Sequence, residues 1–351
     1  MRRSALCVLL TVAAVGCGRA HNAAQPLPAA FVPSALSALD DRDFFLLGTL
    51  PCSAGRCYAI ERTADAGRNF TRMRAPRGLP SEGTSPTLRF ADARDGFVWV
   101  PFDWGALYAT HDGGATWRRM TSPALVAFTT TDGTAYAVEA RCTPSACNGY
   151  RFARAPASSG RWSKSPLPFT PDGPVMDIAA RGRDVWLLGT PRGRFARHDV
   201  LARSTDGGRT FSTMPGPCFP GLGGDLEPSS PRVVWAVCPT GMMAGAARST
   251  DGGATFVPLQ APPLVNAARL SPSSDETAVL AANGAGRPLY RTSDGGRSWR
   301  PTATSGRDEV WSDVAFTDAR VGEALVQVGA RAVAVWRTTD GGASWSRIRS
   351  R

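Results

Sequence analysis

The chain has 351 residues, of which 43% are hydrophobic and 20% are charged, and this provides ample core for one folded domain. Its formal net charge is +11 at pH 7, which would suit an anionic partner. However, Lys164 is the only lysine, and the basic residues form no run of five and no stripe interleaved with aromatic residues. Nucleic acid is therefore not an expected partner.

The N-terminus has the pattern of an export signal. Two arginines precede the apolar stretch Ala5–Val15, which is too short to span a membrane and predicts a signal peptide over residues 1–16. The following Ala14-Val-Gly-Cys17 resembles a bacterial lipobox without its usual first Leu. The resemblance implies a lipid on Cys17 and anchoring to the cell membrane or envelope; an ordinary cleaved signal peptide, giving a secreted protein, is the alternative. Residues 17–33 are rich in Ala and Pro and are expected to form a flexible tether.

From residue 34 onward, the tripeptide Asp-Gly-Gly returns at a near-constant interval, with Ser or Thr two places before the Asp and an aromatic residue after it. The first copy is weaker and the third is decayed, and the copies end at Phe70, Trp117, Trp162, Phe211, Phe256, Trp299 and Trp345. Consecutive ends are 43 to 49 residues apart. Seven copies of this length predict an all-β, seven-bladed propeller over residues 34–351, with four-stranded antiparallel blades.

The fourth unit illustrates the four strands expected in each blade. Short apolar segments lie at 175–180, 184–189, 199–203 and 210–213, with Gly, Pro and Asp at the joins. The repeated motif then falls in the hairpin between strands three and four. There the Asp carboxylate can accept backbone hydrogen bonds, the second glycine can take a positive φ, and the aromatic residue can pack between neighbouring sheets.

The motif resembles the Asp-box, also called the bacterial neuraminidase repeat, which reads Ser/Thr-x-Asp-x-Gly-x-Thr-Trp/Phe. Propellers with this box include sialidases, xyloglucan hydrolases, sortilin-type receptors and the photosystem II assembly factor family. The resemblance implies that the box aspartates make structural turns away from the binding face. These residues are Asp65, Asp112, Asp206, Asp251, Asp294 and Asp340.

Units two and seven also resemble the photosystem II assembly factor family in their order of segments. Phe90-Ala-Asp and Phe316-Thr-Asp each precede a Gly turn and then the Asp-Gly-Gly motif. This resemblance implies a seven-bladed, exported, non-enzymatic scaffold of a chaperone-like kind. The cysteine-containing loops and the decayed third unit depart from that family, so we carry over its fold and binding mode alone.

The cysteines agree with export, because disulfides form in oxidising compartments. Six remain after Cys7 and Cys17, and their number alone does not fix the pairing. Position in the repeat narrows the pairs to 52–57, 142–147 and 218–238, which join Cys52, Cys57, Cys142, Cys147, Cys218 and Cys238. A metal site is the rival interpretation, but the spacing and the few histidines disfavour it. We expect no metal and no cofactor.

All three pairs would lie on one face of the ring, which is the face where propellers usually bind ligands. Long loops of an exported protein need disulfides in any case, so this placement also fits a purely structural role. An exposed Trp beside charged residues is a common anchor in interfaces and sugar sites. The ligand-binding candidates on this face are Asp103, Trp104, Arg141, Arg192 and Arg194. The alternative is that Trp104 merely covers the end of its blade.

The sequence assigns no catalytic residue. The Arg-Ile-Pro motif of sialidases is absent, and all five tyrosines fall within expected strands two or three. Asp177 and Asp313 hold similar places on the first strands of units four and seven, and a carboxylate pair can serve acid–base chemistry, although structural roles near the channel are favoured. The favoured function is a monomeric, non-catalytic propeller that binds a protein or glycan at the cell surface. The alternative is a sialidase-like or other glycoside hydrolase acting on extracellular glycans.

Overall fold

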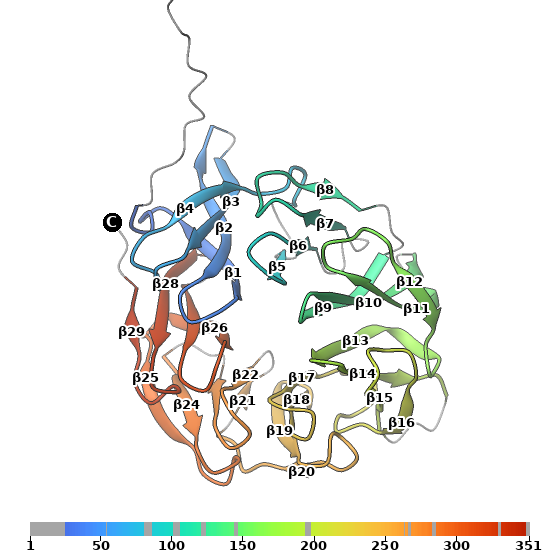
Figure 1. Cartoon of the computed structure of the whole chain (residues 1–351). Helices are drawn as coiled ribbons and strands as arrows, with labels where there is room; N and C mark the ends of the chain where they lie inside the picture. The colour runs from blue at the N-terminus through green and yellow to red at the C-terminus, as the bar shows by residue number, and fades with distance from the viewer. Residues whose placement is uncertain are drawn as a thin grey trace, which may run out of the picture.

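The computed structural model describes residues 25–53, 55–80, 86–100, 106–120, 124–143, 147–193, 198–262, 264–265, 268–282, 286–328 and 331–348. These residues form seven sheets of antiparallel strands arranged in a ring (Figure 1). No helix occurs in these ranges, and so none of the length and apolarity needed to cross a membrane. The predicted all-β, seven-bladed propeller is confirmed.

Each blade is built from consecutive strands. Blade 1 contains β1 (Val32–Ala38), β2 (Phe44–Cys52), β3 (Gly55–Thr63) and β4 (Thr71–Arg74). Blade 2 contains β5 (Thr87–Phe90), β6 (Gly96–Trp99), β7 (Leu107–Thr110) and β8 (Arg118–Arg119). Blade 3 contains β9 (Ala124–Thr131), β10 (Thr134–Cys142), β11 (Cys147–Pro156) and β12 (Ser163–Pro166). Blade 4 contains β13 (Pro171–Arg181), β14 (Asp184–Pro191), β15 (Val200–Ser204) and β16 (Ser212–Pro215).

The remaining blades follow the same order. Blade 5 contains β17 (Asp225–Pro228), β18 (Val234–Pro239), β19 (Met243–Ser249) and β20 (Val257–Pro258), and β21 (Leu264–Val265) pairs with β19 as a fifth strand. Blade 6 contains β22 (Arg269–Pro272), β23 (Ala278–Ala281), β24 (Pro288–Thr292) and β25 (Arg300–Thr304). Blade 7 contains β26 (Glu309–Phe316), β27 (Gly322–Val328), β28 (Arg331–Thr338) and β29 (Ser346–Arg347).

The ring closes by side-chain packing, because blades 7 and 1 share no strand among the described residues. The segment before β1 contributes to this closure. Gln25 pairs with Phe70, and the buried side chains of Leu27 and Phe31 pack in one cluster with Leu325 and Val335 of blade 7. Packed structure therefore begins before residue 34, and the last part of the expected tether over 17–33 lies against the propeller because Leu27 and Phe31 are apolar.

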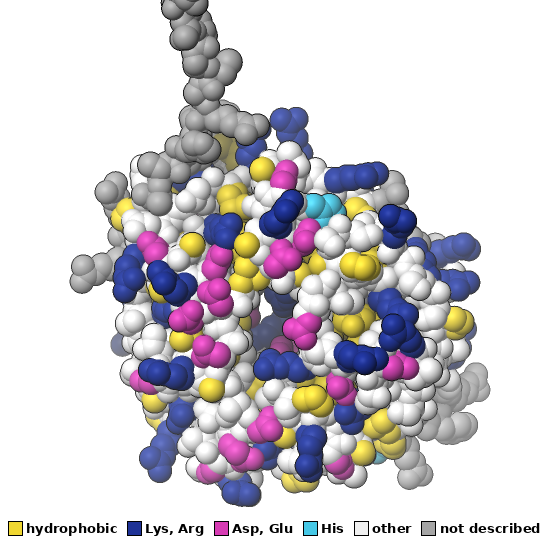
Figure 2. Space-filling view, viewed as in Figure 1, with side chains coloured by type: hydrophobic (Ala, Val, Ile, Leu, Met, Phe, Trp, Pro, Cys, Tyr) yellow, Lys and Arg dark blue, Asp and Glu magenta, His cyan; other side chains and the backbone are white. Residues whose placement is uncertain are grey.

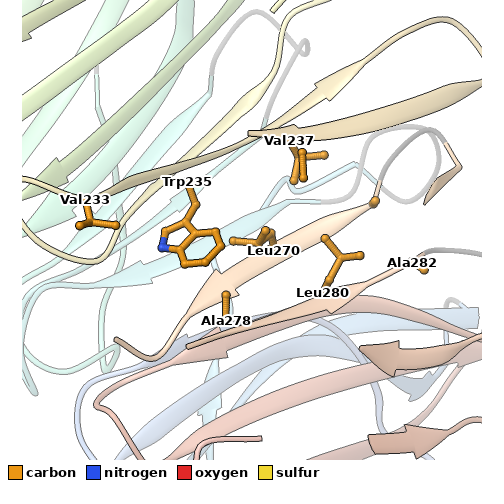
Figure 3. Close-up of a cluster of buried hydrophobic side chains, with 9 residues drawn as sticks. Val233, Trp235, Val237, Leu270, Ala278, Leu280 and Ala282 are labelled. Atoms are coloured by element: carbon orange, nitrogen blue, oxygen red, sulfur yellow. The ribbon is translucent and has the colours of Figure 1, made fainter. Parts of the chain in front are cut away.

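Neighbouring blades pack through buried side chains of their first, second and third strands. Trp235 on β18 has no solvent-exposed surface, and together with Val237 it packs against Leu270 and Leu280 of blade 6 (Figure 3). Close packing of this kind makes each blade depend on its neighbours, and the stability of the ring is then close to a sum of blade and interface contributions.

The aspartate hairpins between strands three and four share one hydrogen-bond pattern. In blade 4, Asp206 Oδ1 accepts hydrogen bonds from the Ser204 hydroxyl at 2.8 Å and the Thr210 backbone N–H at 2.9 Å, and Asp206 Oδ2 accepts one from the Thr210 hydroxyl at 2.7 Å. The Gly208 N–H in turn donates to Ser204 Oγ. Both glycines have positive φ, 74° and 75°, so the first glycine is constrained as well as the second.

The same carboxylate bonds recur in five other blades, at Asp65, Asp112, Asp251, Asp294 and Asp340. These hydrogen bonds stabilise the ionised form of each carboxylate. The hydroxyl of Thr255 is the main cause that lowers the pKa of Asp251 to about 2, and hydrogen bonds from Thr210 lower the pKa of Asp206 well below its usual range. These aspartates are therefore occupied in the turns that contain them.

Arginines on the third strands add a further link between blades, which the sequence analysis did not predict. Each stands immediately before the Ser or Thr of the repeat. Arg203 donates to the Pro231 carbonyl of blade 5 at 2.8 Å, Arg248 to the Asp275 carbonyl of blade 6 at 2.7 Å, and Arg291 to the Gly341 carbonyl of blade 7 at 2.7 Å. Arg337 reaches the Asp41 carbonyl of blade 1 and so joins the last blade to the first. Part of the high arginine content is thus structural.

Candidate binding site at the channel mouth

The three predicted disulfides are present. They join Cys52 to Cys57, Cys142 to Cys147, and Cys218 to Cys238, with Sγ–Sγ distances of 2.10, 2.02 and 2.03 Å. The first two close the loops between strands two and three of blades 1 and 3, and the third ties the loop before β17 to β18. These positions lie at the end of the blades opposite the aspartate hairpins, and we call this end the disulfide face.

On the disulfide face, the loop over residues 216–224 is fixed at several points. The Gly216 N–H donates to the Asp199 carbonyl at 2.7 Å, and the Asp199 N–H donates to the Cys218 carbonyl at 3.1 Å. The Gly221 N–H donates to Thr190 Oγ1 at 2.6 Å. A Cβ on Gly224 would lie 2.4 Å from Cys218 Sγ, so glycine is required where the loop passes the disulfide. The loop is therefore preorganised.

This anchored loop and the turn between β18 and β19 carry exposed apolar side chains. Phe219 is 58% exposed and Leu222 45%, and Met242 and Met243 are 87% and 45% exposed. With Val257, these are the large hydrophobic residues exposed among the described residues. Four of the five thus belong to two segments of the disulfide face, which we call the apolar rim. A concentration of this kind is typical of interaction surfaces.

Beside the rim, a pocket of about 220 Å³ opens between blades 4, 5 and 6. Leu222 and Ala244 contribute apolar walls, and Asp177, Asp225 and Arg269 contribute charged ones. These charged residues come from the first strands, which line the hollow at the centre of the ring (Figures 1 and 2). The pocket is therefore the mouth of the central channel on the side of blades 4 to 6.

Strand register explains why these charges meet. Asp177, Asp225, Arg269 and Asp313 occupy the same first-strand position in blades 4, 5, 6 and 7, as shown by their partners on strand two, which are Leu188, Val237, Ala281 and Leu325. Thr87 holds this position in blade 2, opposite Trp99. The charge is thus concentrated on one side of the channel.

The carboxylates interact electrostatically. Burial, followed by the charge of Asp225, raises the pKa of Asp177 to about 7, although Asp177 Oδ2 accepts a hydrogen bond from the Leu226 N–H at 2.7 Å. Glu227, two residues deeper in the channel, is accessible to water but enclosed by the ring, and desolvation with the charge of Asp177 raises its pKa to about 8. Burial also raises the pKa of Asp313. Asp225 forms an ion pair with Arg269 at 2.8 Å.

The predicted ligand residues lie elsewhere or outside the described residues. Arg141 and Arg192 are exposed on the disulfide face, on blades 3 and 4, but neither lines the pocket. Asp103, Trp104 and Arg194 lie outside the described residues, as does Cys17 with the predicted signal peptide. Of the five ligand candidates, the two that the structure describes, Arg141 and Arg192, therefore lie outside this pocket, and Asp103, Trp104 and Arg194 stay predictions.

Asp177 and Asp313 were recognisable from the sequence as similar positions, whereas the residues that surround them were not. Asp225, Glu227 and Arg269 belong to no spacing motif. The signal for Asp225 and Arg269 was the first-strand position that they share with Asp177 after the repeats are aligned, and Glu227 follows two residues later on the same strand as Asp225. Phe219 and Met242 had a different signal, since both are large apolar residues in Gly-rich turns beside Cys218 and Cys238.

A larger cavity, of about 560 Å³, lies between blades 7 and 1 on the face of the aspartate hairpins. Its charged walls combine four arginines with Asp41 and Asp318. Asp318 is occupied in its own turn, accepting from the Arg320 and Val321 N–H groups at 2.7 Å. We prefer the smaller pocket because apolar and charged groups converge there. Among the described residues, no group of His, Cys, Asp and Glu has an arrangement that could hold a metal ion.

No protein-family model matches the chain, and no curated protein matches it in sequence. Solved structures match in fold. YCF48 from Cyanidioschyzon merolae aligns with a TM-score of 0.56 at 13% identity, over 90% of this chain and 98% of that one. YCF48 bound to D1 peptide aligns with a TM-score of 0.55 at 13% identity, over 90% and 96%. A puromycin-hydrolyzing peptidase from Mycobacterium tuberculosis aligns with a TM-score of 0.60 at 13% identity, over 94% of this chain and 56% of that one. At these identities, the similarities establish that the chain has the propeller fold.

Proposed function

We propose that this protein is an exported, lipid-anchored propeller that binds a protein partner without catalysis, through the apolar rim and the channel-mouth pocket. The observation that carries the proposal is the rim itself. Phe219 and Leu222 are held in water by a loop that a disulfide and backbone hydrogen bonds fix in place, and Met242 and Met243 by the turn after β18, where the Thr240 N–H donates to the Met243 carbonyl. Rigid apolar anchors beside a pocket favour binding, because little conformational entropy is lost on association.

Two further observations support a binding role. The YCF48 propeller, which has the same fold, was solved bound to a D1 peptide. The recurrent carboxylates of this chain are occupied in hairpin turns, as the Asp-box resemblance implies, which leaves the disulfide face for recognition. The anchor rests on the lipobox-like Ala14–Cys17, and mass spectrometry of the mature protein tests it: a lipid on Cys17 is expected, and an unmodified N-terminus beyond that residue would refute it.

The test of the binding role uses photo-crosslinking in the producing cell. A photoreactive phenylalanine analogue is placed at Phe219 and, in a control, at Val257, which is 65% exposed on the outer strand β20. We expect one protein to crosslink at 219 and not at 257. That protein, once purified, should bind the wild-type chain and lose at least tenfold in affinity for the Phe219→Ser/Met242→Ser variant. Equal crosslinking at both positions, or unchanged affinity, would reject the assigned surface.

A glycoside hydrolase is the second candidate, and one observation favours it. Asp177 has a pKa of about 7 and lies near Asp225, and a pair of neighbouring carboxyl groups, one of them with a raised pKa, is what glycoside hydrolysis requires. The test is turnover of fluorogenic sialoside and glucoside substrates between pH 5 and 8. Turnover that disappears in Asp177→Asn would establish the enzyme and displace the non-catalytic proposal.

A further inference from the structure

The chemistry of the channel mouth narrows the kind of protein segment that fits there; this step rests on the proposed binding function. The charged groups that face one another from the first strands are four carboxylates and two guanidinium groups. The carboxylates are Asp177, Asp225, Glu227 and Asp313, and the guanidinium groups are Arg89 and Arg269. The first strands β1 and β9 carry no titratable side chain, and Asp172 and Arg181 of β13 and Glu309 of β26 are not among the main charges that act on Asp177, Glu227 and Asp313. The site therefore has an excess of two negative charges when every group is ionised.

The free protein reduces this excess by holding protons. The ion pair between Arg269 and Asp225 neutralises one carboxylate, and the other carboxylates have raised pKa values. A cation that entered the pocket would restore their ionised forms, because an opposite charge within a few ångströms favours ionisation. Charge complementarity thus favours a cationic ligand group.

The size of the pocket limits that group to a single side chain. A volume of about 220 Å³ lies below the roughly 300–1,000 Å³ of pockets that enclose small molecules. The apolar rim adjoins the pocket through Leu222, which belongs to both, so neighbouring residues of the same ligand would lie on apolar surface. A long side chain with a charged end and an apolar stem suits a pocket with charged and apolar walls.

We infer that the channel-mouth pocket receives one arginine or lysine side chain from an extended segment of the partner, and that large apolar residues flanking this side chain lie on Phe219, Leu222, Met242 and Met243.

The experiment measures binding of labelled nonapeptides to the purified full chain by fluorescence anisotropy. The probe is Gly-Ser-Leu-Phe-Arg-Phe-Leu-Ser-Gly, and its matched control carries citrulline, a neutral analogue of similar shape, in place of Arg. We expect the arginine peptide to bind at least tenfold more tightly at pH 7.5, as loss of a charge-assisted hydrogen bond predicts. Its advantage should grow between pH 6 and pH 8, because fewer protons then compete for the carboxylates.

Two variants separate the contributions of charge and apolar surface. Asp177→Asn/Asp313→Asn should reduce the preference for arginine to about one while leaving the affinity for the citrulline peptide unchanged. Phe219→Ser/Met242→Ser should weaken both peptides equally. Equal binding of the two peptides to the wild type, a preference that survives the Asp177→Asn/Asp313→Asn change, or no binding of the arginine peptide up to about 1 mM would overturn the inference. Crosslinking at position 219 without an arginine preference would leave the proposed function standing and reject this inference alone.

Discussion

On the face of the aspartate hairpins, six carboxylates accept the same hydrogen bonds at nearly the same distances, whereas the disulfide face differs from blade to blade. Its disulfides occur in blades 1, 3 and 5, and its exposed apolar side chains belong to two segments. The aspartate hairpins occur in nearly every blade because every blade needs a closed hairpin and a packed interface. A feature confined to one or two blades is not required to hold a blade, and this makes it a better candidate for recognition.

The largest effect is expected from the disulfide that fixes the rim. Replacing Cys218 and Cys238 by Ser should lower the free energy of unfolding by about 3 kcal/mol, because the closed loop spans 20 residues. Denaturant unfolding measures this loss. The same change at Cys52 and Cys57, which close a loop of 5 residues, is the control and should cost less. Equal losses would contradict the anchoring role given to the third disulfide.

The channel carboxylates should make stability depend on pH in a direction opposite to that of the hairpin aspartates. Asp177 and Glu227 titrate near 4 in the unfolded chain but have pKa values of about 7 and 8 in the folded one. The stability that these two groups contribute to the folded state is fully present below about pH 4. It is lost as the pH rises through their folded pKa values, because the folded state then releases protons that it binds more tightly than the unfolded chain does.

The Asp177→Asn/Glu227→Gln variant tests this dependence. The free energy of unfolding of the variant, measured relative to that of the wild type, should increase by about 1–2 kcal/mol between pH 5 and pH 8. This figure allows for the screening of the charges by water in the channel. Thermal unfolding across this range measures the gain. An unchanged difference between the two proteins at pH 5 and pH 8 would show that the carboxylates do not repel one another as described.

A smaller effect is expected where the hairpin pattern is imperfect. Blade 1 has Ala66 where five other hairpins have the first glycine, and Ala66 takes a φ of 64°. A left-handed conformation costs an alanine about 1 kcal/mol, so Ala66→Gly should raise the free energy of unfolding by about 0.5–1 kcal/mol despite the greater freedom of glycine when unfolded. Gly113→Ala, the reverse substitution at the same hairpin position of blade 2, is the control and should lower the free energy of unfolding. A loss of stability in Ala66→Gly would mean that backbone strain does not explain the glycine pattern.

The sequence predicted what is local and repeated. The blade number, the hairpin turns and the three disulfides depend on contacts within one repeat, so spacing alone revealed them. The hydrogen bonds of Asp206, for example, all lie within four residues of it. The packing of Leu27 and Phe31 against blade 7 was not predictable in this way, because these residues stand outside the repeat and meet their partners only when the ring closes.

Predicting the site at the channel mouth would have required the strand register of several blades at once. Asp177 and Asp313 stood out as similar positions, but their relation to Asp225 and Arg269 depends on which residue of each first strand faces the channel. A shift of one residue would turn these side chains toward the opposite face of the sheet. The strand-three arginines, such as Arg203, were similarly hidden in the composition, because their partners lie in the next blade.

The comparison of Asp112→Ala with Phe219→Ser/Met242→Ser most directly tests the division between the two faces. Asp112→Ala removes the hairpin bonds of Thr110 and Thr116 and should cost about 1–2 kcal/mol of stability, while the folded protein still binds the crosslinked partner with wild-type affinity. The rim variant should change stability by less than about 0.5 kcal/mol and lose at least tenfold in affinity. The reverse result, with affinity lost in Asp112→Ala and kept in the rim variant, would contradict the account.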